Sequence, residues 1–134
     1  MTKFLLDTNV ISQLVRNPTG PLLDRIIEVG GFAAVCTSII AASEVRFGAE
    51  KKGAPRLAAQ IEAVLGALTV HPFLEPADRN YAALRNALER IGRQIGANNM
   101  LIAAHALALD CVLVTDNVRE FERVPDLRVE NWLG

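Results

Sequence analysis

Short apolar runs alternate with amphipathic stretches along the chain. The apolar runs end at polar or turn-forming residues, as buried strands do, and predict strands at 3–6, 32–36, 69–71, 111–114 and 127–130. Apolar residues at helical spacing predict helices near 10–15 and 22–27, at 39–50, in the Ala- and Leu-rich segment after Pro55, at 76–91 and at 100–108. Strands without polar alternation, separated by helices, are typical of a parallel sheet covered on both faces. We therefore expect an α/β sandwich.

Composition narrows this picture. The 134 residues are 51% hydrophobic and 22% charged, which suits one soluble, well-packed domain spanning 1–134. The apolar runs are too short to span a membrane and no signal peptide is apparent, so we expect a cytoplasmic protein. A net charge of −1 gives no overall attraction to nucleic acid. Residues 79–93, with four arginines against one glutamate, leave a nucleic-acid partner open.

Two predicted strands end in similar polar sequences. Leu5-Leu6 is followed by Asp7-Thr8-Asn9, and Leu113-Val114 by Thr115-Asp116-Asn117. Because ligands bind where the carboxyl ends of parallel strands meet, we expect Asp7 and Asp116 to lie close together. Either aspartate alone is an ordinary helix N-cap. The pair favours a hard divalent cation such as Mg²⁺ or Mn²⁺, since two nearby carboxylates repel unless a cation lies between them.

Glu44 is a third candidate. It lies four residues after Ile40 and three after Ala41, on the apolar face of its predicted helix, and so points inward. Arg46 projects elsewhere, because residues two apart on a helix do not face each other. Two interpretations remain open, a salt bridge to an arginine of another element and a metal site. Asn99, at the start of the helix that continues to 108, is from its position alone a plain N-cap.

These positions carry a resemblance to a known family. The chain resembles the PIN-domain ribonucleases, and among them the VapC toxins of bacterial toxin–antitoxin pairs, over nearly its whole length. The matching blocks, in the family's order and spacing, are Phe4-Leu5-Leu6-Asp7-Thr8-Asn9, Glu44 to Glu50, Gly96 to Ala106, Leu113 to Phe121 and Leu127 to Leu133. The resemblance implies a three-layer α/β/α sandwich with a mainly parallel sheet of roughly five strands.

The resemblance also implies a chemistry. Asp7 would be the central ligand of Mg²⁺ or Mn²⁺, and Glu44 and Asp116 would bind the ion directly or through water. Thr115, beside Asp116, would support them, and Thr8 and Glu120 are secondary candidates. The metal would activate a water molecule that hydrolyses an RNA phosphodiester, with tRNA the expected substrate.

Asn99 departs from the family. The pattern there is Gly-x-Asn-Asp, so Asn99 replaces an expected aspartate and keeps one carbonyl acceptor without the charge. We expect weaker cation binding and impaired activity, whether the amide is natural or was introduced to disarm a toxin. The alternative is a catalytically inactive PIN-like module that binds RNA or protein. A phosphoryl-transfer enzyme of another α/β family is disfavoured, because those enzymes carry a second aspartate where this chain has Asn9.

The partners follow from the resemblance as well. Family members form homodimers and are neutralised by a cognate VapB-type antitoxin that inserts into the groove of the acidic pocket. Candidates for contacts with RNA phosphates are Arg46, Arg85, Arg93 and Arg119.

Overall fold

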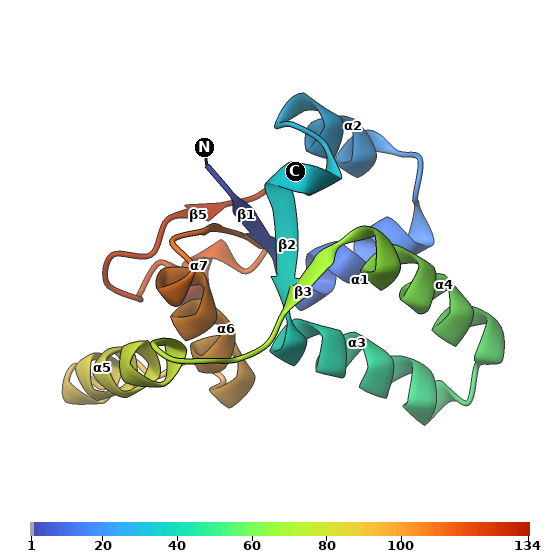
Figure 1. Ribbon diagram of the computed structural model, residues 1–134. Helices are drawn as coiled ribbons and strands as arrows, with labels where there is room; N and C mark the ends of the chain where they lie inside the picture. The colour runs from blue at the N-terminus through green and yellow to red at the C-terminus, as the bar shows by residue number, and fades with distance from the viewer. Residues whose placement is uncertain (1) are drawn as a thin grey trace.

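The computed structural model describes residues 2–134 and places a five-stranded sheet at the centre of the molecule (Figure 1). The strands are β1 (Phe4–Leu6), β2 (Val35–Ser38), β3 (Thr69–His71), β4 (Val112–Val114) and β5 (Val129–Glu130). Their order is β3-β2-β1-β4-β5, and each neighbouring pair is parallel. The predicted five-stranded sheet is confirmed, with β1 at its centre.

Helices cover both faces of the sheet, as the sandwich prediction requires. They are α1 (Thr8–Arg16), α2 (Pro21–Glu28), α3 (Ile39–Lys52), α4 (Pro55–Ala67), α5 (Ala77–Arg90), α6 (Ala97–Ala108) and α7 (Val118–Phe121). In Figure 1, α1 to α4 lie on one side of the sheet and α5 to α7 on the other. No helix within residues 2–134 is long and apolar enough to cross a membrane.

The local sequence explains where α3 and α4 begin and end. The Ser38 hydroxyl caps α3 by accepting a hydrogen bond from the backbone N–H of Ile40 at 3.0 Å. Gly53, in the left-handed conformation at φ 60°, ends that helix, since a residue with a side chain is strained there. Pro55 opens α4 at a position where its missing N–H costs nothing. The two helices therefore form a tight hairpin.

Several predicted boundaries were wrong. Residues 32–34 form a 3-10 turn (η1) rather than a strand, because Gly31 at φ 80° turns the chain just before them. The short helix α7 was not predicted, since four residues are too few to show a helical period. Helix α6 begins at Ala97 instead of position 100, so Asn99 lies inside its first turn.

The carboxyl ends of β1, β2 and β4 meet at one edge of the sheet, and the site residues gather there. Every residue of these three strands is buried. The pairing of β1 and β4 extends one residue further, because the backbone N–H of Asp7 donates to the carbonyl of Val114 at 2.9 Å. Asp7 is thereby held directly beside Thr115, which follows β4. This central, rigid edge positions the candidate site.

Candidate active site

Asp7 lies at the centre of the site and is only 4% exposed. One carboxylate oxygen caps α1 by accepting from the backbone N–H of Thr8 at 2.8 Å. The other accepts from the Thr115 hydroxyl at 2.7 Å. Burial raises the pKa of Asp7, the two hydrogen bonds oppose that rise, and the charges of Glu44 and Asp116 add to it. Asp7 is thus both a helix cap and a desolvated carboxylate with two acidic neighbours.

Glu44 reaches from α3 toward α1. Its carboxylate accepts a hydrogen bond from the Thr8 hydroxyl at 3.1 Å, and the residue is partly buried, as its inward direction predicted. Within residues 2–134 it forms no salt bridge with an arginine, so the first of its two interpretations is wrong. Thr8 lies between Asp7 and Glu44 and hydrogen-bonds both, through its backbone and its hydroxyl. It therefore orders two of the carboxylates.

Thr115 and Asp116 bring the end of β4 to the same place. Thr115 is fully buried, donates to Asp7, and accepts from the backbone N–H of Asn117 at 3.0 Å. Asp116 is exposed and accepts from the Asn9 side-chain amide at 3.1 Å. Two side-chain hydrogen bonds therefore join the two strand ends with similar sequences. One runs from Thr115 after β4 to Asp7 after β1, and the other runs from Asn9 after β1 to Asp116 after β4. Asp116 supplies the solvent-facing wall of the site.

Asn99 does not cap its helix, because Gly96 occupies the N-cap position of α6. Its side-chain amide instead donates to the Glu120 carboxylate at 3.1 Å. Glu120 also accepts from the Asn117 amide at 3.0 Å and from the backbone N–H of Gly96 at 2.7 Å. These donors, Asn117 above all, lower the pKa of Glu120. The carboxylate thus ties the start of α6 to α7.

Sequence reasoning missed Asn117 as a partner of Glu120. The signal was present, because the two residues lie three apart and face the same way once the segment is helical. It went unused because α7 itself was not predicted. Glu120 and Asn99, singled out separately, are brought into direct contact.

The side chains suit a hard cation by chemistry. Asp7, Glu44 and Asp116 offer only oxygen atoms, and the burial of Asp7 makes an added positive charge favourable. Within residues 2–134, no three His, Cys, Asp or Glu side chains stand together as a ready ligand set for one ion. That arrangement is compatible with Mg²⁺, which binds proteins through one or two carboxylates and keeps several waters. The chemistry of this donor set fits the expected ion.

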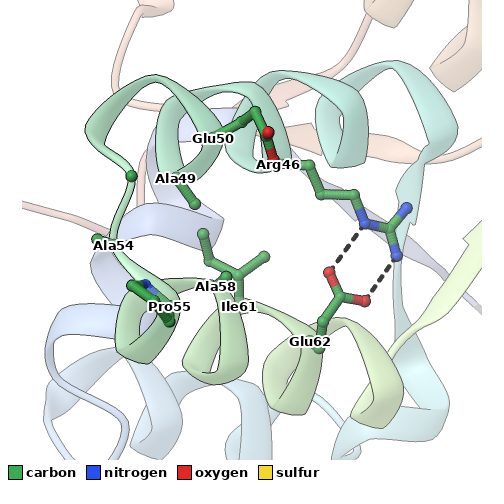
Figure 2. A pocket seen from close by; sticks show the side chains of 9 residues that line it. Arg46, Ala49, Glu50, Ala54, Pro55, Ala58, Ile61 and Glu62 are labelled. Carbon is green, nitrogen blue, oxygen red and sulfur yellow. Dashed lines mark hydrogen bonds and ion pairs between the residues drawn. The ribbon is translucent and has the colours of Figure 1, made fainter.

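The four arginine candidates for RNA contacts differ in whether a side chain of the protein already pairs with them. Arg46 makes two hydrogen bonds to Glu62 of α4, at 2.9 and 3.0 Å, beside a cavity of about 430 Å³ between α3 and α4 (Figure 2). Arg85 is held by Glu89 at 2.8 Å and by the Tyr81 hydroxyl at 3.0 Å. In the described part of the chain, Arg93 and Arg119 are exposed and form no salt bridge.

Comparisons with known proteins identify the family. The family model of the PIN domain matches residues 4–127. Ribonuclease VapC2 of Haemophilus influenzae is 37% identical, covering 99% of this chain and all of that protein. The tRNA(fMet)-specific endonuclease VapC of Salmonella typhimurium is 35% identical, covering 98% of this chain and 99% of that protein.

Solved structures give the same result. The DNA-bound VapBC of Salmonella typhimurium superposes with a TM-score of 0.91 at 35% identity, and VapBC2 of Rickettsia felis, bound to a promoter DNA fragment, with 0.90 at 29%. Each match covers 98% of this chain and 99% of the other. The sequence match and the shared fold show that this chain belongs to the PIN-domain family and, within it, to the VapC ribonucleases.

Proposed function

We propose that this chain is the toxin of a toxin–antitoxin pair, an endoribonuclease that hydrolyses RNA with the help of Mg²⁺ or Mn²⁺. The observation that carries the proposal is the buried Asp7 carboxylate. It is clamped by Thr115 and lies close enough to Glu44 and Asp116 for both charges to raise its pKa. Buried carboxylates whose pKa is perturbed by neighbouring charges cluster at functional sites.

Asp7, Glu44 and Asp116 would hold the ion. When bound, it supplies an activated water molecule and neutralises charge on the scissile phosphate. The protein's own part is to keep the carboxylates in place. The Thr115 hydroxyl fixes one oxygen of Asp7, and the Thr8 hydroxyl orients Glu44 across the gap between α1 and α3. The Thr115 hydroxyl donates its hydrogen bond, so it favours the charged, metal-binding form of Asp7.

With Asn99 in place of an aspartate, this site should bind a cation more weakly than a site built only from carboxylates. Its amide lacks the negative charge of the family's aspartate, and it donates a hydrogen bond to Glu120. Glu120, whose charge is already balanced by three hydrogen-bond donors, has less to offer a cation. We therefore assign this chain reduced cation affinity and reduced activity.

The partners are proposed from the relatives. One relative is named for action on tRNA(fMet), which makes tRNA the substrate class to test first. The VapBC structures join toxin and antitoxin, which supports a VapB-type antitoxin as the regulator of this chain. We also propose a homodimer.

A second candidate is a PIN-like module that binds RNA or a protein without cutting. The Asn99 amide favours it, because the pocket lacks one carboxylate of the family's set.

The test compares the chain with its Asn99→Asp variant on total tRNA, with Mg²⁺, with Mn²⁺ and with chelator. We expect metal-dependent cleavage by the variant, strongly reduced cleavage by the parent, and none in chelator. Asp7→Ala in the Asn99→Asp background controls for contaminating nuclease. If both proteins are folded and free of antitoxin and neither cuts tRNA or ribosomal RNA, the nuclease proposal is wrong and the binding module replaces it.

A further inference from the structure

A groove leads away from the acidic site between α1, α3 and α4. It holds a cavity of about 180 Å³ whose lining includes Thr8 and Glu44 at one end. Leu57 and Ile61 of α4 form part of its apolar floor. The groove is therefore continuous with the residues that surround Asp7. Its lining shares Ala49 and Ile61 with the cavity beside Arg46 in Figure 2, but that cavity includes neither Thr8 nor Glu44.

Two polar rows line this groove. Thr8, Ser12 and Arg16 follow one another at four-residue intervals on α1, and residues four apart lie on one helix face. Glu44, Gly48 and Lys52 repeat the same spacing on α3. Eight residues of helix rise by about 12 Å. Each row thus starts at the acidic site and ends at a basic residue whose backbone lies about 12 Å further along the helix.

The two cations at the ends of the rows, Arg16 and Lys52, have no acidic partner among the described residues. The Arg16 guanidinium donates only to the neutral Gln13 side chain at 3.1 Å, one turn back on its own helix. Arg46 on the same hairpin is neutralised by Glu62. The far end of the groove therefore presents two exposed cations that are free to meet an anion.

We propose that Arg16 and Lys52 bind a phosphate of the RNA strand that flanks the cleavage site, so that this groove is the path of the substrate. The assignment rests on the proposed function and names the residues that position the RNA. A strand whose cleaved phosphate lies at Asp7 carries its other phosphates away from the site. Cations at a fixed distance set its register without reading its sequence.

Gly48 keeps the groove open. A Cβ atom built at this position meets no heavy atom within 4 Å, and Gly48 itself lines the groove, so we expect a longer side chain there to occupy part of it. Gly66 on α4 is equally unobstructed but does not line the groove. Because both are helical glycines, replacing either has a similar effect on the helix itself. The pair separates blockage of the groove from any general effect of the substitution.

The first experiment measures binding of a fluorescein-labelled tRNA by anisotropy between 50 and 200 mM KCl, with the chain as it stands. Arg16→Gln and Lys52→Gln should each weaken binding roughly three- to tenfold and lower the slope of log affinity against log salt by about 0.7. Lys51→Gln is the matched control, since it removes the same charge one residue away and outside the groove. Gly48→Gln should weaken binding, whereas Gly66→Gln should not.

The outcomes separate this inference from the nuclease proposal. If the Asn99→Asp protein cuts RNA but Arg16→Gln and Lys52→Gln bind it no differently from Lys51→Gln, the substrate path is wrong and the nuclease stands. If the variants lose RNA affinity and the Asn99→Asp protein never cuts, the groove binds RNA and the nuclease is wrong. Variants that keep RNA affinity but bind a VapB-type antitoxin more weakly would mark a protein-binding groove and overturn the proposal.

Discussion

Replacing Asn99 by aspartate should destabilise the metal-free protein. The change removes a hydrogen bond of 3.1 Å from the Asn99 amide to the Glu120 carboxylate and sets two carboxylates against each other. A hydrogen bond to a charged group contributes about 1.5–3 kcal/mol. Repulsion at this separation adds from about 1 kcal/mol in water to about 5 kcal/mol at an effective dielectric of 20, and partial exposure of both residues favours the low end.

The helix offsets part of this cost. Asn99 lies in the first turn of α6, where a negative charge is favourable by about 0.3–1 kcal/mol. We expect a net loss of about 2 kcal/mol, or roughly 6–10 °C in Tm for a domain of this size. Thermal unfolding in chelator measures it. Titration with Mg²⁺ should then restore the Tm of the variant, because an ion present at about 100 times its Kd adds about 2.7 kcal/mol to the free energy of unfolding. The parent chain should gain less.

Asn98→Asp is the control for this experiment. It places the same charge in the same helical turn, but Asn98 is exposed and is not among the described residues that hydrogen-bond Glu120. Its Tm in chelator should stay within about 2 °C of the parent. An Asn99→Asp protein that is as stable as Asn98→Asp in chelator, or that responds to Mg²⁺ no more than the parent, would refute our account of how Asn99 and Glu120 interact.

Three further predictions concern buried polar groups. Asp7→Asn should raise the stability of the metal-free protein by about 1 kcal/mol, because burial penalises the charged form of Asp7, and an unchanged or lower Tm would contradict this expected gain. In the Asn99→Asp background, Asp7→Asn should also abolish RNA cleavage. Thr115→Val should lower the free energy of unfolding in urea by about 1–3 kcal/mol, since the Thr115 hydroxyl donates to Asp7 at 2.7 Å. Thr69→Val on the exposed edge strand should change that free energy little, and equal effects of the two variants would contradict this account. His105 lies 2.7 Å from the Ser38 hydroxyl, and burial lowers its pKa below the ordinary 6.5, so its contribution to stability is present above about pH 6.5 and declines as pH falls toward the folded pKa. The drop in Tm between pH 7.5 and 5 should therefore be smaller in His105→Gln than in the parent, and an equal drop would refute this assignment.

Much of the fold is local and was predictable. The apolar runs of β1 and β4, the proline at the start of α4 and the spacing of apolar residues in α3 act within a few residues, so the sequence shows them directly. Glu44 belongs to this class, because helical periodicity alone turns it inward. Where local signals are short, as in η1 and α7, the prediction was wrong or silent.

The sequence also determined which residue types are present for chemistry. Asp7 and Asp116 each follow an apolar strand, and the carboxyl edge of a parallel sheet is where such residues meet. Their expected gathering at one edge agrees with the fold, since β1 and β4 are direct neighbours in the sheet.

Only the tertiary structure decided how these residues are partnered. That Thr115 clamps Asp7, that Thr8 joins Glu44, and that Asn99 meets Glu120 depends on contacts across 21 to 108 positions of sequence. The polar rows ending in Arg16 and Lys52 form one groove only because α1 and α3 pack side by side. Periodicity fixes which way a side chain points along its own helix or strand, but the packing of distant segments determines what it meets.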